Sequence, residues 1–169
     1  VVKSLNLTLG VVEKRQTLPI LSNVLMEVDE SSLRFTATDL ESEITTTSTI
    51  SNFKSGGKIT APARKLNDLC RLLPDLTEIH FFLDGDNLNI ETHSGKYNLS
   101  TLPSDDFPSF EIEDIDSQIN ISSENLSMLI SKTSFAMGNQ DWRHYLNGLF
   151  IYIDDKNITA VATDAHRLA

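Results

Sequence analysis

The chain contains one segment twice, at an offset of 125 residues (Asp39 against Asp164). Residues 21–39 align with residues 146–164 without a gap, and apolar positions of one segment match apolar positions of the other. Identical residues recur at five positions: Leu21 and Leu146, Asp29 and Asp154, Ala37 and Ala162, Thr38 and Thr163, and Asp39 and Asp164. Solenoid repeats have periods of about 20–50 residues, so this longer period indicates a duplicated domain.

The composition is typical of a globular protein large enough to bury a core. Of the 169 residues, 40% are hydrophobic and 22% are charged, which suits one domain or one and a half. No apolar run approaches the roughly 20 residues of a membrane span, so we expect no membrane partner. The single cysteine, Cys70, excludes a disulfide within the chain. The four histidines lack the spacing of metal ligands, so we expect no metal site.

The charge balance disfavours a tight nucleic-acid binder, because phosphate binding needs a basic face. The net charge is −10 and the pI is near 4.7. Charges are screened beyond about 8 Å at physiological salt. A few basic residues on one face can therefore contact DNA while acidic residues elsewhere repel it, and a loosely bound DNA partner is still allowed.

The residue pattern of the first unit predicts two helices and several antiparallel strands. One helix is expected over 1–9 with Gly10 at its end, and a second begins at Pro62 and ends before Pro74. Leu66, Leu69, Cys70 and Leu73 form the apolar face of the second helix. Strands are expected over 21–28, 33–38, 43–50, 58–61, 78–83, 87–92 and 96–102.

The second unit follows an acidic, turn-rich segment, residues 104–116, which we interpret as a linker. We expect a strand over 118–121, a helix capped by Ser122 or Ser123, and strands over 146–153 and 158–163. The fold class is therefore α+β, with duplicated domains that each have two helices and antiparallel sheets. The first domain is expected over 1–112 without its opening strand. The second is expected over 113–169 without its later part, so we expect a fragment of a longer protein.

Six strings resemble the bacterial DNA polymerase III beta subunit family, the sliding clamps. In chain order they are TLPILSN (17–23), TDLE (38–41), PARK (62–65), LSTLP with DFP (99–103 and 106–108), YLNG (145–148) and ATDAHRL (162–168). The resemblance implies the DNA clamp fold, in which each subunit has three copies of one domain and two subunits close head to tail into a ring. Three units of this period would need about 375 residues.

The family's function, as the resemblance implies it, is topological and not catalytic. The ring encloses duplex DNA without sequence preference and tethers the replicative DNA polymerase, which raises the polymerase's effective concentration. The implied partners are double-stranded DNA, the polymerase, the clamp loader, other clamp-motif peptides and a second subunit in a homodimer ring. No cofactor is implied, and the implied location is the bacterial cytoplasm. A few scattered phosphate contacts would permit sliding.

The resemblance implies DNA contacts at the inner rim of the ring. Arg15 falls on Gln140 at the repeat offset, and both lie in the predicted turn between helix and strand. Arg143 is a further candidate. The alternative is that all three are solvated loop residues.

A cleft for short hydrophobic partner peptides is implied in the second domain. In it, Leu146 and Leu168 would form an apolar floor, and His166 and Arg167 a polar rim. The first unit has Glu41 and Ser42 in place of the rim residues, which favours a function for the pair. The alternative places Leu146 and Leu168 in the core and makes Thr163 and Asp164 a turn; for Asp164 the turn is preferred, because Asp39 repeats it. The cleft residues are Tyr145, Leu146, Thr163, His166, Arg167 and Leu168.

A subunit interface is implied in the first domain, where strand edges would pair across the boundary. Lys65 and Lys96 would face acidic partners, whereas Leu69 and Leu73 are equally well explained as core. The interface residues are Lys65, Leu69, Leu73, Lys96 and Tyr97.

Two other classes of function compete with a clamp. Asp39, Asp164 and His166 could serve an enzyme as acid–base residues, but no nucleophile motif or phosphate-binding glycine loop accompanies them. An enzyme would lose turnover on Asp164→Ala, whereas a clamp would lose at most stability. A protein-interaction scaffold of the same fold without DNA would lose nothing on Arg15→Ala.

Overall fold

The computed structural model describes residues 1–12, 18–108, 118–154 and 156–169. The chain falls into two compact units, Val1–Glu111 and Ile112–Ala169, and each is considered by itself. The domain boundary expected after residue 112 lies in residues 109–117, outside the described residues.

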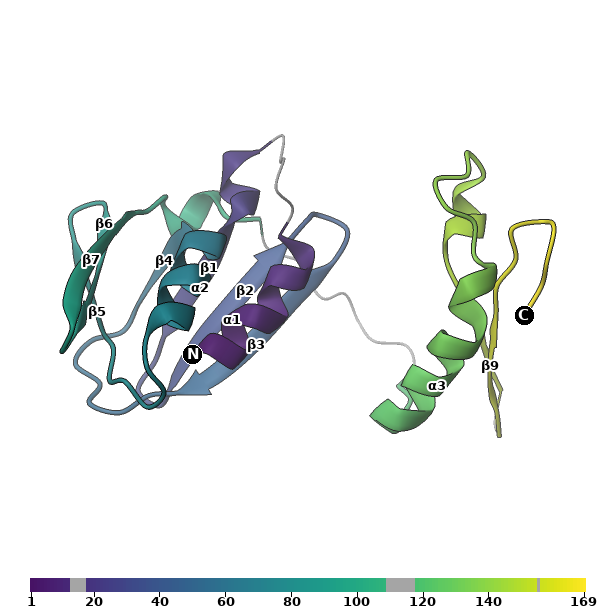
Figure 1. Ribbon diagram of the computed structural model, residues 1–169, viewed down its shortest axis with the longest axis horizontal. Coiled ribbons are helices and arrows are strands. Elements are labelled where there is room, and N and C mark those ends of the chain that lie inside the picture. Colours follow the sequence, from purple (N-terminus) through teal and green to yellow (C-terminus); the bar gives the residue numbers. More distant parts are fainter. Residues whose placement is uncertain (13–17, 109–117, 155) are drawn as a thin grey trace. The chain divides into compact units, whose positions relative to one another are not determined.

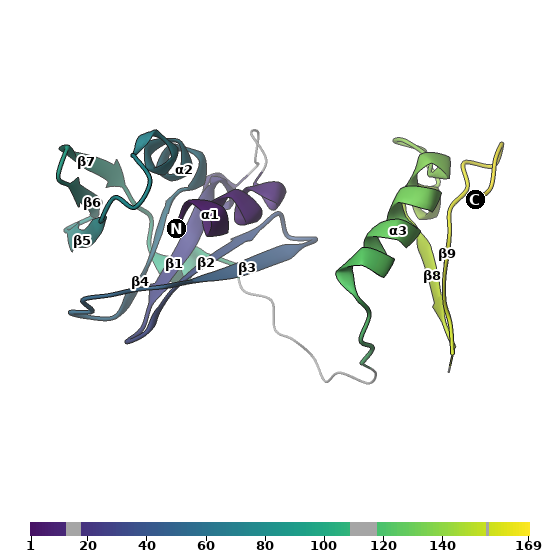
Figure 2. The same ribbon diagram turned by 60° about the horizontal axis from the view of Figure 1, so that its bottom comes forward.

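The first unit is built on a four-stranded antiparallel sheet of order β3-β2-β1-β4. Two helices, α1 (Val2–Thr8) and α2 (Ala63–Leu72), cover one face of it, as Figures 1 and 2 show. The strands are β1 (Asn23–Val28), β2 (Ser32–Thr38), β3 (Glu43–Thr49) and β4 (Gly57–Pro62).

The core of this unit lies between the sheet and the two helices. Leu33, Phe35 and Ala37 of β2 alternate in sequence and are all buried, at 2%, 0% and 0% exposure. Leu5 of α1 and Leu66 of α2 belong to the same buried cluster. The strict alternation along β2 therefore predicted which face of the sheet is covered.

A smaller sheet of order β5-β6-β7 completes the first unit (Figure 1). Leu88 and Ile90 of the middle strand join the main core. Thr60 and Leu102 exchange two backbone hydrogen bonds of 3.3 Å, which connect β4 to the residues after β7. The strands are β5 (His80–Asp84), β6 (Asn87–Thr92) and β7 (Gly95–Ser100).

The second unit contains one long helix beside a two-stranded sheet (Figure 2). Helix α3 (Ser123–Thr133) begins after Ser122, whose Oγ accepts a hydrogen bond from the Asn125 backbone N–H at 3.2 Å. Ser122 is therefore the cap, and Ser123 is the first helical residue. Strands β8 (Phe150–Ile153) and β9 (Ile158–Val161) pair antiparallel, and α3 packs against β9.

The structure corrects several details of the predicted elements. Gly10 does not end the first helix, because a 3-10 turn, η1 (Leu9–Val11), runs through it. The strand expected from residue 21 begins at Asn23, because η2 (Pro19–Ser22) turns the chain first. The strand expected from residue 146 begins at Phe150 for the same reason, after η5 (His144–Asn147). Residues 118–121 pair with no strand among the described residues, so they form no ladder. Phe107, expected in the linker, is buried against Ile20 and Leu21 of the first unit.

The sequence repeat is reproduced in the backbone at the same offset. Helices α1 and α3 end at Thr8 and Thr133, and each continues into a 3-10 turn, η1 or η4 (Ser134–Ala136). The turns η2 and η5 (His144–Asn147) also correspond. The ladder Leu25↔Thr36 to Val28↔Leu33 recurs as Phe150↔Val161 to Ile153↔Ile158, which is the same register shifted by the repeat offset. The two units are therefore copies of one supersecondary structure.

In the described parts of the chain, no helix is long and apolar enough to cross a membrane. No group of His, Cys, Asp and Glu side chains in those parts is suited to hold a metal ion.

Candidate functional site

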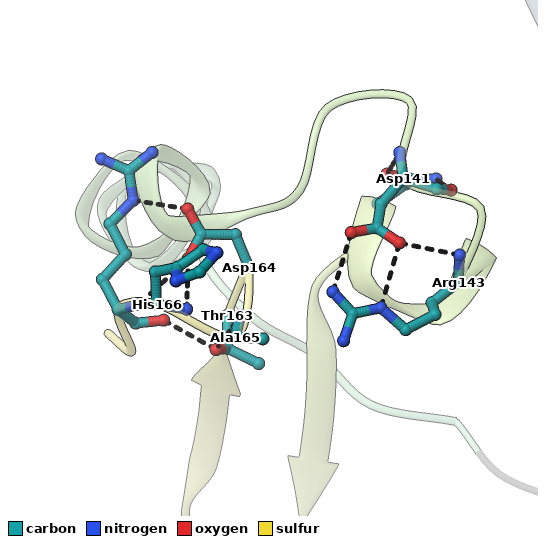
Figure 3. A network of polar contacts seen from close by, with 8 residues as sticks. Asp141, Arg143, Thr163, Asp164, Ala165 and His166 are labelled. Atoms are coloured by element: carbon teal, nitrogen blue, oxygen red, sulfur yellow. Dashed lines mark hydrogen bonds and ion pairs between the residues drawn. The ribbon is translucent and has the colours of Figure 1, made fainter.

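Two loops of the second unit meet at one end of the β8–β9 pair. Because β8 and β9 are antiparallel with Phe150 opposite Val161, the residues before β8 and those after β9 leave the sheet at the same end. Figure 3 shows both loops with their polar side chains. We call residues 138–148 the entry loop and residues 162–168 the exit loop.

The exit loop is closed by its own side chains. Thr163 Oγ1 accepts the Ala165 N–H at 3.0 Å and donates to the Arg167 carbonyl at 2.7 Å. Asp164 Oδ1 accepts the backbone N–H groups of His166 and Arg167, at 2.9 and 3.0 Å. Ala165 has a positive φ of 72°. The loop is therefore a defined turn whose shape depends on Thr163 and Asp164.

The first unit contains the same turn. Thr38 Oγ1 accepts the Leu40 N–H and donates to the Ser42 carbonyl, and Leu40 has a φ of 75°. Asp39 Oδ1 accepts the N–H groups of Glu41 and Ser42, at 3.0 and 2.7 Å. These contacts support the interpretation of Asp164 as a turn former rather than an acid–base residue.

The exit loops of the two units differ in one ion pair. Arg167 Nε donates to Asp164 Oδ2 at 2.9 Å. Hydrogen bonds from the His166 N–H, and after them the charge and hydrogen bonds of Arg167, hold the pKa of Asp164 below its ordinary value. The side chain of Arg167 is 58% exposed.

Four of the expected cleft residues are exposed to solvent, whereas one is buried. Tyr145 and Leu168 are 77% and 74% exposed, and His166 and Arg167 are also exposed. Leu146 is only 6% exposed, as its counterpart Leu21 is at 2%. Its burial therefore comes from the shared fold, as the core alternative for this residue states.

The entry loop is held by a bidentate ion pair. Arg143 Nε and Nη2 donate to the two carboxylate oxygens of Asp141, at 3.1 and 2.9 Å (Figure 3). Asn147 accepts the Asp141 N–H at 3.0 Å and donates to its carbonyl at 2.9 Å. The hydrogen bonds from Arg143 lower the pKa of Asp141 to about 2. The carboxylate is therefore ionised throughout the neutral range.

The entry loop presents Gln140 and Trp142 to solvent. Gln140 is exposed and has a φ of 55°. Trp142 is 82% exposed, with the Arg143 guanidinium 5.8 Å from its ring centroid. Arg143 is only 30% exposed and forms an ion pair with Asp141. Its positive charge is therefore partly neutralised, and it would attract a DNA phosphate less strongly than an unpaired arginine. Arg15, the predicted counterpart of Gln140, lies outside the described residues.

The expected interface residues come from α2 and β7. Lys65 is exposed, and Leu69 and Leu73 are half-buried with Leu69 against the core. Lys96 Nζ lies 2.6 Å from Glu91 Oε1, and Tyr97 is 38% exposed. Within the described parts of the chain, no hydrogen bond or ion pair joins the α2 members to the β7 members.

Comparison with known families gives each unit its own match. The family model of the DNA polymerase III beta subunit N-terminal domain matches residues 1–111, and that of the central domain matches residues 120–169. The chain belongs to the DNA polymerase III beta subunit family. The resemblance noted in the sequence and the α+β clamp fold are thereby confirmed.

Relatives in this family match nearly all of the chain. The beta sliding clamp of Vibrio cholerae is 42% identical over 168 residues, covering 99% of this chain and 46% of the relative. That of Pseudomonas aeruginosa is 43% identical over 167 residues, with the same coverage. The chain thus spans about half the length of the curated relatives it matches.

Solved beta-subunit structures superimpose closely on the chain. The crystal structure of the DNA polymerase III subunit beta from Pseudomonas aeruginosa has a TM-score of 0.95 at 42% identity, covering 99% of this chain and 45% of that one. The Caulobacter crescentus pol III beta structure has a TM-score of 0.91 at 38% identity, covering 99% and 46%. One Pseudomonas aeruginosa sliding clamp in this group, with a TM-score of 0.95, is bound to griselimycin.

Three residues that shape this part of the beta-subunit fold were not predicted from the sequence. Asp141 and Asn147 brace the entry loop, and Trp142 is its most exposed large hydrophobic side chain. The Asp-Trp-Arg order was a sequence signal for the ion pair between Asp141 and Arg143, because a carboxylate two residues before an arginine favours a local pair. The bond between Asp141 and Asn147 depends on the fold of the loop and has no comparable signal in the sequence.

Proposed function

We propose that the protein acts as a DNA sliding clamp, which encircles duplex DNA and tethers the replicative DNA polymerase without catalysing a reaction. The observation that carries the proposal is that the two structural copies match two successive domains of the beta subunit. Relatives that cover 99% of the chain bear the name beta sliding clamp. The implied setting is the bacterial cytoplasm, with the clamp loader as a further partner.

A sliding clamp must hold DNA loosely. Phosphate contacts are sequence-independent and become weaker with salt, so a small number of them allows movement along the duplex. The acidic net charge of −10 is compatible with this if donors are confined to one rim. We assign this role to Gln140 and to Arg15. Arg143 is assigned a weaker contribution, because Asp141 engages its guanidinium.

Partner peptides are assigned to the exit loop and its neighbours. Tyr145 and Leu168 offer exposed apolar surface, and His166 and Arg167, which precede Leu168 in the chain, offer exposed polar groups. Thr163 contributes by fixing the turn, and Leu146 supports the site from below as a buried residue. An aromatic or aliphatic anchor with a polar rim is a common form of peptide site.

The subunit boundary of the proposed homodimer ring is assigned to α2 and β7. Lys65, Lys96 and Tyr97 are the exposed members, and Lys96 is paired with Glu91. Leu69 and Leu73 are half-buried within the first unit, so part of their apolar surface is available to a partner.

The DNA assignment is tested in the full-length protein with Arg15→Ala and Gln140→Ala combined. The protein is loaded onto nicked circular DNA by its clamp loader, and its residence on DNA is measured together with its affinity for a polymerase peptide. We expect a shorter residence on DNA and an unchanged peptide affinity. The matched control combines Arg34→Ala and Gln118→Ala, which removes the same two side-chain types from exposed positions elsewhere.

An unchanged residence on DNA would show that the rim assignment is wrong. If the protein also bound peptides normally, it would favour a protein-interaction scaffold of the same fold.

A further inference from the structure

The two units repeat one turn, but they use its aspartate differently. In both, Oδ1 accepts the two backbone N–H groups that close the turn, as Asp39 and Asp164 show. Only Asp164 uses its second oxygen, Oδ2, for a side chain, the Arg167 guanidinium at 2.9 Å. The first unit has Ser42 at the corresponding position, and Asp39 has no ion pair among the described residues. One carboxylate oxygen is therefore enough to form the turn.

The bond to Asp164 leaves most of the Arg167 guanidinium available. It is made through Nε, and the terminal nitrogens Nη1 and Nη2 have no hydrogen-bond partner among the described residues. Arg143 in the entry loop provides the contrast, because Asp141 engages both its Nε and its Nη2 (Figure 3). Arg143 is also less exposed, at 30% against 58%. In the Asp141–Arg143 pair the aspartate thus engages two guanidinium nitrogens, whereas in the Asp164–Arg167 pair it engages one and leaves the terminal nitrogens available.

The geometry points to Asp164 as a positioning residue for peptide recognition. We propose that it holds the Arg167 side chain in one orientation, so that Nη1 and Nη2 face an acceptor oxygen of a bound peptide. Two donors on one planar group suit a carboxylate or a backbone carbonyl. The exposed Leu168, which follows Arg167 in the chain, and the exposed Tyr145, whose loop leaves the same end of the β8–β9 pair, supply the apolar contacts. This inference rests on the proposed peptide site and adds a residue that orients Arg167 within it. It replaces the expectation from the sequence that a change of Asp164 in a clamp would affect stability alone.

The expected effect is a change in affinity. An unrestrained arginine loses more side-chain freedom on binding than one that is already held in place, because an arginine side chain has many rotamers. Loss of the hold should therefore weaken peptide binding by roughly 2- to 10-fold. The turn itself should be unaffected if Oδ1 is retained.

The test measures binding of the full-length protein to a fluorescein-labelled peptide from the clamp-binding segment of the replicative polymerase. Asp164→Asn keeps an oxygen for the turn and removes the charge that holds Arg167. Asp39→Asn is the matched control, because it makes the same change in a turn without an arginine. Both variants are also made in an Arg167→Ala background, and thermal unfolding confirms that each is folded.

We expect Asp164→Asn to weaken binding by roughly 2- to 10-fold, Asp39→Asn to leave it unchanged, and Asp164→Asn to have no effect once Arg167 is alanine. A merely structural role of Asp164 would persist in the absence of Arg167. Equal effects of the two Asn variants, or an equal effect of Asp164→Asn in both backgrounds, would overturn the positioning role alone. If Arg167→Ala itself leaves the affinity unchanged, the peptide site is misplaced and the inference fails with it.

Discussion

Four aspartates in this chain form their turns with their own side chains. Each accepts backbone N–H groups two and three residues ahead, and they fall into two pairs related by the repeat: Asp29 with Asp154, and Asp39 with Asp164. These hydrogen bonds hold the pKa values of Asp29, Asp154 and Asp164 below the ordinary range. Identity at these positions of the repeat thus reflects the turns, and the residues proposed for peptide binding lie beside them.

The Asp141–Arg143 ion pair should make the stability of the fold depend on pH within a defined acidic range. The folded-state pKa of Asp141 is about 2, against a reference value of 3.8. A lowered carboxylate pKa stabilises the fold above the reference value, and that contribution is lost as the pH falls toward the folded-state pKa. A pH titration of the Asp141 carboxyl carbon by NMR should give a midpoint near 2.

The matched variant is Arg143→Gln, which removes the charge and the bidentate bond. The midpoint for Asp141 should then rise toward 3.8. A midpoint that stays near 3.8 in the unsubstituted protein would show that the pair does not persist in solution.

Leu76 should be replaceable by glycine with a gain in stability. It has a φ of 62° and is fully exposed, so its side chain contributes no burial and its backbone conformation is unfavourable. Leu76→Gly should raise the free energy of unfolding by about 1 kcal/mol, because glycine adopts this conformation without strain. Urea unfolding followed by far-UV circular dichroism measures the change.

Leu72→Gly provides the opposite sign in the same experiment. Leu72 is also exposed, at 86%, but it is the last residue of α2. Glycine should destabilise the helix there by up to about 1 kcal/mol. A loss of stability for both variants would mean that the conformation of Leu76 is not strained.

At the scale of elements, the parts that depend on local pattern could be predicted from the sequence. The alternation of Leu33, Phe35 and Ala37 predicted the buried face of β2, and Pro62 and Pro74 predicted the limits of α2. The strand expected over 118–121 forms no ladder among the described residues, because a strand forms only where a partner strand supplies hydrogen bonds. The predictions failed where distant segments decide the structure.

The candidate site, like the fold, could be predicted from the sequence only in part. The repeat offset singled out His166 and Arg167 as an asymmetry between the units, and both lie exposed in the exit loop. It left open whether Leu146 belongs to the cleft or to the core, and it gave no sign that Asn147 would bind the backbone of Asp141. The hydrogen bonds of Asn147 depend on how the entry loop folds, which residue spacing does not encode.

The buried face of β2 should contribute strongly to the stability of the first unit. Phe35 has no exposed surface and packs within the main core. Phe35→Ala should therefore lower the free energy of unfolding by about 3–5 kcal/mol, through lost burial and a cavity. Phe82→Ala on β5, where the ring is 45% exposed, should cost less than about 1 kcal/mol. Urea unfolding of both variants checks this, and similar losses would place the core elsewhere.

At the scale of the whole molecule, the duplication places different side chains on one shared backbone arrangement. The two units share helix ends, 3-10 turns and ladder register, so the shared features serve the fold. The acidic net charge of −10 and the few donors proposed for the rim are compatible with a protein that surrounds DNA without holding it tightly. The central claim is therefore topological, and affinity alone does not test it.

The most direct measurement loads the full-length protein onto nicked circular DNA with its clamp loader. The amount bound is determined before and after a restriction enzyme linearises the circle. We expect the protein to be retained on the circle and lost on linearisation, because a ring that surrounds DNA slides off free ends. Equal retention on the circular and linear forms would contradict the account and indicate ordinary binding by a scaffold of the same fold.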